Sequence, residues 1–420
     1  MIYHLFQYLQ RYDIPGQRLF TYLSFRAMLT SVTAMLIAFF IGKWIISWLQ
    51  RKQIGETIRD LGLEGQMQKK GTPTMGGIII IISIVVPVLL FCDLTNVYLQ
   101  LLLFTTLWCG ALGFADDYIK VFKKNKEGLS PRKKLLGQIL LGLVVGSVMY
   151  FHPNAVICEK KVQQQNVTEV NSIELLKVEN QENVHTPRLF DEPHHSSKTT
   201  IPFFKNHELD YSVLTRWMGD ESGKWSFLFF IPIIVFIIAA VSNGANLTDG
   251  LDGLATGVTS SVAVGIALLA YVSGNVIFAN YLDIMYIPNI GELVIFISAV
   301  IGACIGFYWW NCYPAQVFMG DTGSLTLGGI VAVSCIIIRK ELLIPILCGI
   351  YLAQSISVIM QVSYFKYTKK KYGEGRRIFL MAPLHHHFQK KGLHESKIVQ
   401  RFIVVSILLA ILTLVTLKIR

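Results

Sequence analysis

The chain has 420 residues, of which 53% are hydrophobic and only 15% are charged. Soluble domains carry about 25% charged residues, so this composition excludes an ordinary soluble protein. Apolar runs of roughly 17–25 residues recur along the sequence, and in lipid such runs are stable as helices because their backbone groups are hydrogen-bonded internally. We therefore expect an all-α, polytopic membrane protein with one transmembrane domain over residues 1–420.

Ten membrane spans are predicted in chain order. They cover residues 27–49, 75–92, 97–115, 135–151, 226–242, 254–272, 293–310, 322–338, 342–362 and 402–417. A further apolar stretch at 276–287 is too short to cross the membrane and contains Asp283, so we place it in a loop or at the interface. The first 26 residues mix polar and aromatic side chains and do not resemble a cleavable signal peptide.

The basic residues indicate which side of the membrane each loop occupies. The loops after the first, third and ninth spans contain 22 of the 38 Lys and Arg residues, whereas the short loops of the other side contain only Arg339 and Lys340. The positive-inside rule places the basic loops in the cytoplasm and both termini outside. This distribution explains the net charge of +11, and no nucleic-acid partner is expected.

Residues 152–225 separate the fourth and fifth spans and are polar. Their position predicts an extracytoplasmic insertion, either a small subdomain or a partly disordered segment. The sequon at Asn166 is too short a pattern to predict glycosylation. The seven cysteines include no C-x-x-C pair, and we expect neither a metal site nor a disulfide from them.

Five polar motifs interrupt the apolar sequence, and each follows an odd-numbered span. They are KKGTPTMGG (69–77), DDYIK (116–120), NGANLTDGLDGLA (243–255), FMGDTGSLTLGG (318–329) and APLHHHFQKKG (382–392). Because the loops after odd-numbered spans share one side in the predicted topology, all five motifs are expected on the cytoplasmic face.

Together the motifs supply the groups that phosphoryl transfer needs. Carboxylates are hard ligands suited to Mg²⁺, lysines neutralise phosphate charge, and glycines let backbone N–H groups approach phosphate oxygens. Phosphoryl transfer depends mainly on positioning and charge stabilisation. A metal ion and a polyanion would therefore explain why the motifs place basic residues beside five acids, namely Asp116, Asp117, Asp249, Asp252 and Asp321.

Each motif also has a simpler interpretation. The pair Asp116 and Asp117 is compatible with a solvated helix end, and the NLTDGLDGLA and MGDTGS motifs are compatible with helix caps. The lysines of 120–134, taken alone, are typical of topology signals and of contact with anionic lipids. What favours a site is that all of these motifs are expected on one face.

The three consecutive histidines, His385 to His387, invite a zinc interpretation. Consecutive side chains point in different directions, so His385 and His386 are instead predicted to contact phosphate or its neighbours. A transporter is the alternative class of protein, because acids within membranes often mark ion pathways. Transporter sites usually lie at mid-membrane, however, and no repeat relates the first five spans to the last five.

The motifs resemble those of the polyprenyl-phosphate N-acetylhexosamine-1-phosphate transferase superfamily. DDYIK, NLTDGLDG and GDTGS carry the superfamily pattern, while KKGTPTMGG and APLHHHFQKKG narrow the resemblance to the branch that uses MurNAc-pentapeptide. The resemblance covers all ten predicted spans, but the segment 152–225 is far longer than the usual loop at that position. It implies a homodimer among the lipids of the bacterial inner membrane, with the active site on the cytoplasmic face.

The resemblance also implies a reaction. Phospho-MurNAc-pentapeptide would pass from UDP-MurNAc-pentapeptide to undecaprenyl phosphate with Mg²⁺ as cofactor, giving lipid I and UMP, the first membrane step of peptidoglycan synthesis. A sister enzyme using UDP-GlcNAc is the alternative within the superfamily. The residue spacing does not choose between direct attack by the lipid phosphate and a two-step route through an aspartyl phosphate, and we expect direct attack.

Individual roles follow from matching motifs. Asp321 is the implied Mg²⁺ ligand, with Asn246, Asp116 and Asp117 as further candidates. The implied catalytic residues are Asp116, Asp117, Asp321 and His385. The implied substrate-binding residues are Lys70, Lys120, Lys133, Asn246, Asp249, Gly250, Leu251, Asp252, Phe318, Gln361, Ala382 and His386. Among them, Gly250, Leu251 and Phe318 are assigned to uracil, and Lys120 and Lys133 to phosphate.

Overall fold

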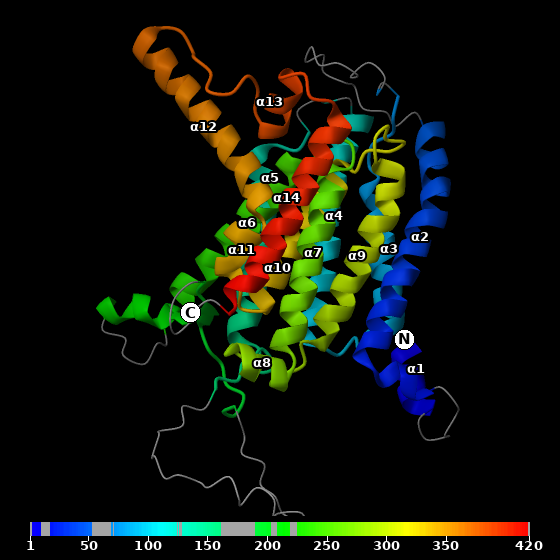
Figure 1. The fold of residues 1–420 in the computed structure, drawn as a ribbon, viewed down its shortest axis with the longest axis vertical. Coiled ribbons are helices and arrows are strands. Elements are labelled where there is room, and N and C mark those ends of the chain that lie inside the picture. The colour runs from blue at the N-terminus through cyan, green and yellow to red at the C-terminus, as the bar shows by residue number, and fades with distance from the viewer. Residues whose placement is uncertain are drawn as a thin grey trace, which may run out of the picture.

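The computed structural model places a helix at each of the ten predicted spans (Figure 1). It describes the chain outside residues 1, 10–16, 53–68, 70, 124, 126, 127, 161–189, 203–207, 219–224, 419 and 420. The helices are α2 (Leu23–Arg51), α3 (Gly77–Phe91), α4 (Val97–Phe122), α5 (Pro131–Phe151), α6 (Phe227–Thr248), α7 (Leu254–Ser273), α9 (Gly291–Asn311), α10 (Gly320–Ile337), α11 (Ile344–Leu347) with α12 (Gly349–Tyr372), and α14 (Glu395–Thr416). The all-α membrane fold is thus confirmed.

Two of the predicted spans differ from simple crossings. Within the described residues, eight helices are long and apolar enough to span a membrane, and nine are if the bent pair around Cys348 counts as one span. That pair bends by 78°, so the span predicted at 342–362 is present as two helices with a break between them; Pro345 lies in the first turn of the short α11, and α12 continues to Tyr372. Helix α3 has only 15 residues, about 22 Å at 1.5 Å per residue.

The packing of α4 against α10 places the first acids. These two helices pack along each other, and α10 also packs against α6 and α3. Gly113 on α4 touches the backbone of Asp321, and Gly77 at the start of α3 touches the backbone of Gly323, so a Cβ at either glycine would overlap main-chain atoms. Gly113 therefore allows the end of α4, and Gly77 the start of α3, to lie directly against the start of α10.

The polar motifs gather at one end of the bundle. The short helix α13 (Leu384–Lys390) lies there, whereas α8 (Val276–Leu282) and the N-terminal α1 (Ile2–Leu9) lie at the opposite end (Figure 1). The end of α14 also points away from α13. The placement of α8 agrees with a non-spanning segment at 276–287. The cytoplasmic and extracytoplasmic assignments of the two ends stay predictions.

The described parts of the long connection 152–225 pack on the end of the bundle opposite α13. Strands β1 (Lys198–Thr200) and β2 (Glu208–Asp210) form an antiparallel pair. The backbone N–H of Thr200 donates to the carbonyl of Arg339 at 3.0 Å, between α10 and α11, and Cys158 exchanges backbone hydrogen bonds with Tyr286. Asn166 lies outside the described residues, and all seven cysteines are free.

Candidate active site

Three carboxylates meet where α4 ends and α10 begins. Asp116, Asp117 and Asp321 each offer an oxygen, and these oxygens lie within 4.8 Å of one another. Asp116 and Asp117 are buried, and Asp321 lies in the first turn of α10. Uncompensated, three carboxylates so close together would repel one another strongly, so the surrounding donors decide how the cluster is held.

Asp117 caps α10 from the neighbouring helix. Its Oδ1 accepts from the backbone N–H of Asp321 at 3.1 Å, and its Oδ2 accepts from the backbone N–H and the hydroxyl of Thr322 at 2.9 and 2.6 Å. The first N–H groups of a helix have no partner within the helix, and a carboxylate there is favoured by the helix dipole. Asp117 therefore holds the start of α10, and with it Asp321, against α4.

Two lysines bridge Asp116 and Asp321. The Lys120 ammonium lies 2.6 Å from Asp116 Oδ2 and 3.2 Å from Asp321 Oδ2. The Lys134 ammonium lies 3.0 Å from Asp116 Oδ1 and 2.5 Å from Asp321 Oδ2. The backbone N–H of Leu129 also donates to Asp116 Oδ1 at 2.7 Å. Three carboxylates and two ammonium groups leave a net charge of −1 in this acidic cluster.

Asn246 joins the acidic cluster from the end of α6. Its side-chain amide donates to Asp321 Oδ1 at 2.9 Å and to the Ser324 hydroxyl at 3.0 Å. Carboxylate oxygens around a residual negative charge are the ligand chemistry of Mg²⁺, so the residues present fit a divalent cation. Asp116, Asp117 and Asp321 are the group of side chains that could hold it.

A second cluster, called here the Lys69 cluster, consists of Lys69, Asp252 and Glu395. Lys69 makes ion pairs with Asp252 Oδ1 and Glu395 Oε1, each at 2.6 Å. Burial opposes the charge on Lys69, but the two carboxylates outweigh it and raise the pKa above its usual 10.5. Phe318 lies beside this Lys69 cluster, with its ring centroid 6.0 Å from the Lys69 ammonium. The predicted ligand Lys70 lies outside the described residues.

The loop 249–253 rests on His385. Gly250 lies so close to His385 Nε2 that a Cβ at position 250 would overlap the imidazole ring. His385 is fully buried, its Nδ1 pairs with Gln354 Oε1 at 3.1 Å, and its Nε2 has no hydrogen-bond partner among the described residues. Burial, with a smaller contribution from His386, holds the pKa of His385 well below 6.5, so this imidazole is neutral at pH 7.

The other predicted site residues lie on α12, α13 and the loops beside them. The Gln361 side chain accepts from the backbone N–H groups of Ile378 and Phe379, both at 3.0 Å, and fixes this loop to α12. His386 Nδ1 pairs with Gln389 Oε1 at 2.7 Å, and burial followed by the nearby Lys69 lowers the pKa of His386 despite that pairing. Ala382 is half-buried just before α13, while Leu251 is buried and Asp249 ends α6.

The sequence motifs did not assign a role to three charged residues of these clusters, namely Lys69, Lys134 and Glu395. They predicted Lys133 as a phosphate contact in place of Lys134. Lys134, not Lys133, reaches the acidic cluster; Lys133 is exposed and makes no ion pair with the described residues. Lys134 lies one helical turn before the buried Gln138. Residues four apart share a face of a helix, so this spacing could have indicated that Lys134 lies on the inner face of α5. Lys69 precedes the predicted Lys70, and Glu395 belongs to none of the five motifs.

Comparison with known proteins identifies the family. A family model described as Glycosyl transferase family 4 matches residues 197–339, and a phospho-N-acetylmuramoyl-pentapeptide-transferase signature matches residues 69–81. Phospho-N-acetylmuramoyl-pentapeptide-transferases are 57% identical in Flavobacterium psychrophilum, 55% in Parabacteroides distasonis and 51% in Porphyromonas gingivalis, with 100% of each chain covered. The chain belongs to the phospho-N-acetylmuramoyl-pentapeptide-transferase family.

Membership in the phospho-N-acetylmuramoyl-pentapeptide-transferase family makes this protein an enzyme, a phosphotransferase of the membrane, and excludes the transporter alternative. The matched signature begins at Lys69, one partner of the Lys69 cluster. Because the alignments cover the whole of each chain, the relatives are of similar length and have a counterpart of the connection 152–225.

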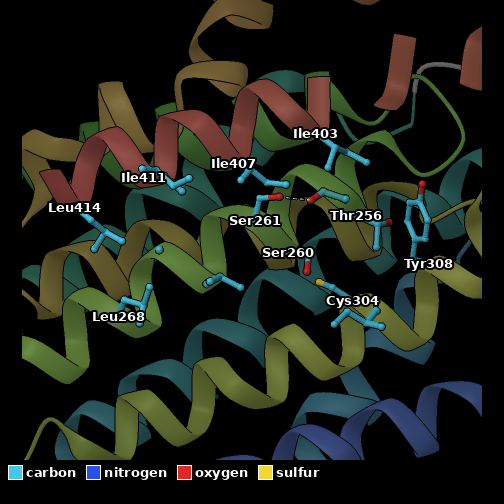
Figure 2. Close-up of a pocket in the computed structure, with 15 residues that line it drawn as sticks. Thr256, Ser260, Ser261, Leu268, Cys304, Tyr308, Ile403, Ile407, Ile411 and Leu414 are labelled. Carbon is cyan, nitrogen blue, oxygen red and sulfur yellow. Dashed lines mark hydrogen bonds between the residues drawn. The ribbon is translucent and has the colours of Figure 1, made fainter. Parts of the chain in front are cut away.

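A separate pocket of about 600 Å³ lies between α7, α9 and α14 of this transferase. Figure 2 shows its apolar walls, formed by Ile403, Ile407, Ile411 and Leu414 from α14 and by Cys304 and Tyr308 from α9. No acid of either cluster lines it. The pocket is thus distinct from the polar site, whose acids lie on α4, on α10, in the loop before α7 and in the first turn of α14.

Proposed function

We propose that this enzyme transfers phospho-MurNAc-pentapeptide from UDP-MurNAc-pentapeptide to undecaprenyl phosphate in a Mg²⁺-dependent reaction, releasing UMP and forming lipid I. The observation that carries the proposal is the convergence of Asp116, Asp117 and Asp321 with two lysines at the end of the bundle where the motif loops gather. The family and the matched signature support MurNAc-pentapeptide over UDP-GlcNAc as the donor.

The acidic cluster would hold the reacting phosphates. Asp321, with Asp116, Asp117 and the side-chain oxygen of Asn246, would bind Mg²⁺, which when bound offsets charge on the pyrophosphate. Lys120 and Lys134 would turn from the carboxylates toward phosphate oxygens and neutralise them. An oxygen of the lipid phosphate then bonds to the β-phosphorus, the bond from that phosphorus to the bridging oxygen breaks, and UMP leaves with the bridging oxygen.

Direct attack is favoured over an aspartyl phosphate. Both oxygens of Asp117 already accept hydrogen bonds from the start of α10. Asp116 accepts from Leu129 and pairs with two lysines. Carboxylates engaged in this way are poor nucleophiles, because each donor withdraws charge from the attacking oxygen. Orientation of the lipid phosphate, through the two lysines that it holds, is the role that suits Asp116.

The Lys69 cluster and its neighbours would bind the donor. Phe318 presents a ring for stacking on uracil, and the backbone of Gly250 and Leu251 lies in the adjoining loop with Asp249 and Asp252. His386, Gln361 and Ala382 would line the nucleotide and sugar. His385 would act on the pyrophosphate side or through Gly250, and Lys70 is a proposed contact to uracil.

The cellular setting follows from the same proposal. The enzyme would lie in the bacterial inner membrane as a homodimer among membrane lipids, with the clusters on the cytoplasmic face, where the nucleotide donor is made. There it would carry out the first membrane step of peptidoglycan synthesis. The basic loops on that side support the orientation through the positive-inside rule.

The test is UMP release by the purified protein in detergent with undecaprenyl phosphate, Mg²⁺ and either donor. We expect release with UDP-MurNAc-pentapeptide and none with UDP-GlcNAc. Release with UDP-GlcNAc alone would move the protein to the sister specificity. Folded protein that releases no UMP from either donor would contradict the proposed reaction.

A further inference from the structure

Glu395 connects segments that lie far apart in the sequence. Its Oε1 accepts from the Lys69 ammonium at 2.6 Å and from the backbone N–H of Asp252 at 2.7 Å. Asp252 in turn accepts from Lys69 through Oδ1 and from the backbone N–H of Ala315 through Oδ2 at 3.0 Å. The start of α14, the loop before α3, the loop before α7 and the loop before α10 therefore meet in one network.

The network is shielded from water and has little freedom to rearrange. Asp252 and Glu395 are 3% and 7% exposed. Removing one partner from a buried ion pair is strongly destabilising, because the other charge stays buried without compensation. Without Glu395, Lys69 would keep only Asp252 as a partner, and the backbone N–H of Asp252 would lose its acceptor.

Glu395 is the fixed member of the network. It lies in the first turn of α14, where the helix dipole favours a carboxylate, directly after His394, whose side chain caps the helix. The next turn of α14 buries Ile398 and Val399, and α14 packs along α7. The other three members lie on loops, so their positions depend on Glu395 more than its position depends on them.

The charge balance limits what Lys69 can recognise. One ammonium faces two carboxylates, so its positive charge is already compensated. Lys69 therefore suits a neutral oxygen acceptor, such as a base carbonyl, better than a phosphate. Phe318, 6.0 Å away, supplies an aromatic face beside it. In the acidic cluster, in contrast, a metal ion could bind the carboxylates in place of the lysines, which would free the lysines to contact phosphate.

We infer that Glu395 is a positioning residue for the nucleotide half of the site. It sets Lys69, the 249–253 loop and Phe318 in the relative positions that bind the base of the donor, and it has no part in binding the lipid phosphate. This inference rests on the proposed function, because that function assigns these segments to the nucleotide.

The molecule offers a matched control in Glu292. This residue also lies in the first turn of a helix, α9, and is 7% exposed. It pairs with Arg26 at 2.8 Å and accepts from the backbone N–H of Asp93 at 2.9 Å. Arg26 and Asp93 border the end of the bundle opposite α13, so Glu292→Gln and Glu292→Ala test the loss of a similar ion pair away from the clusters.

The experiment measures UMP binding by the full-length protein in detergent, and the KM of each substrate in turnover, for Glu395→Gln, Glu395→Ala and the Glu292 variants. We expect Glu395→Ala to weaken UMP binding and raise the donor KM by about tenfold or more, the loss typical of a buried hydrogen bond to a charged group. Glu395→Gln keeps an acceptor oxygen and should lose less. The KM for undecaprenyl phosphate should stay within about twofold, a change too small to signify a lost contact.

The outcomes separate the inference from the proposed function. Unchanged UMP binding in either folded Glu395 variant would overturn the inference, as would equal increases in both KM values or a matching loss in the Glu292 variants. If Glu395→Ala does not fold, Glu395→Gln still decides, since it preserves the shape of the side chain. Wild-type protein that binds no UMP and turns over neither donor would instead contradict the proposed function itself.

Discussion

The Lys134 ammonium lies 2.5 Å from Asp321 Oδ2, although 187 positions separate the two residues. Lys134 thus completes the acidic cluster from α5, and its neighbour Lys133 points outward. We expect Lys134→Ala to lower kcat by about 100-fold, the usual cost of removing a group that stabilises transition-state charge. Lys133→Ala, measured in the same UMP-release assay, should remain close to wild type. Equal losses of kcat in both variants would mean that the overall positive charge of this segment supports turnover, and not the contact between Lys134 and Asp321.

Asp117 and Asp321 should respond differently to substitution. Asp117→Ala removes the cap of α10. It should lower the free energy of unfolding by about 1 kcal/mol or more and should also reduce activity. Asp321→Ala should abolish turnover with a smaller change in melting temperature, because its partners are side chains that can reach water. Melting curves and turnover on the same preparations would show this, and wild-type turnover in Asp321→Ala would refute its role in the reaction.

Removal of divalent ions should stop the reaction reversibly. We expect EDTA to abolish UMP release and Mg²⁺ to restore it, because the acidic cluster has a net charge of −1 that a divalent cation would offset. The UMP affinity measured without Mg²⁺ should change less than turnover, since none of the proposed Mg²⁺ ligands belongs to the Lys69 cluster. Full turnover in EDTA would contradict the Mg²⁺ proposal.

Gly250→Ala should damage the donor side specifically. The new Cβ would overlap the His385 imidazole, and overpacking of this kind costs about 1–3 kcal/mol. We expect a higher donor KM with little change in the KM of undecaprenyl phosphate. The double variant Gly250→Ala with His385→Ala should lose less than the sum of the single variants, because both changes act at one contact. Strict additivity would show that the two residues are independent.

His385 should make stability depend on pH. Its pKa is held well below 6.5 in the folded protein, so the unfolded chain binds more protons as the pH falls. The contribution of the buried neutral imidazole to the free energy of unfolding is fully present above pH 6.5 and is lost progressively as the pH falls below that value. Melting temperatures between pH 8 and 5 should therefore fall less steeply for His385→Gln than for wild type; His195→Gln, on an exposed side chain, should retain the wild-type slope.

The apolar runs predicted a helix at every one of the ten places, because hydrophobic length is a local property of the sequence. The motifs likewise predicted that Asp116, Asp117 and Asp321 would converge. Hydropathy gave no angle for the bend between α11 and α12, since it measures length and not direction. The choice of Lys134 over Lys133 depends on the phase of α5. The contact of Glu395 with Lys69 depends on packing across nearly the whole chain, which no local pattern reports.

The Lys69–Glu395 ion pair spans 326 positions, and this separation has a consequence for biosynthesis. The ribosome synthesises nine of the ten predicted spans before it reaches Glu395. A nascent chain therefore cannot form the Lys69–Glu395 ion pair until α14 is made. Prematurely terminated chains that end before α14 would carry the complete acidic cluster and still lack the anchor for the nucleotide loops. On the proposed function, such truncated chains would therefore bind the donor more weakly than the finished polypeptide.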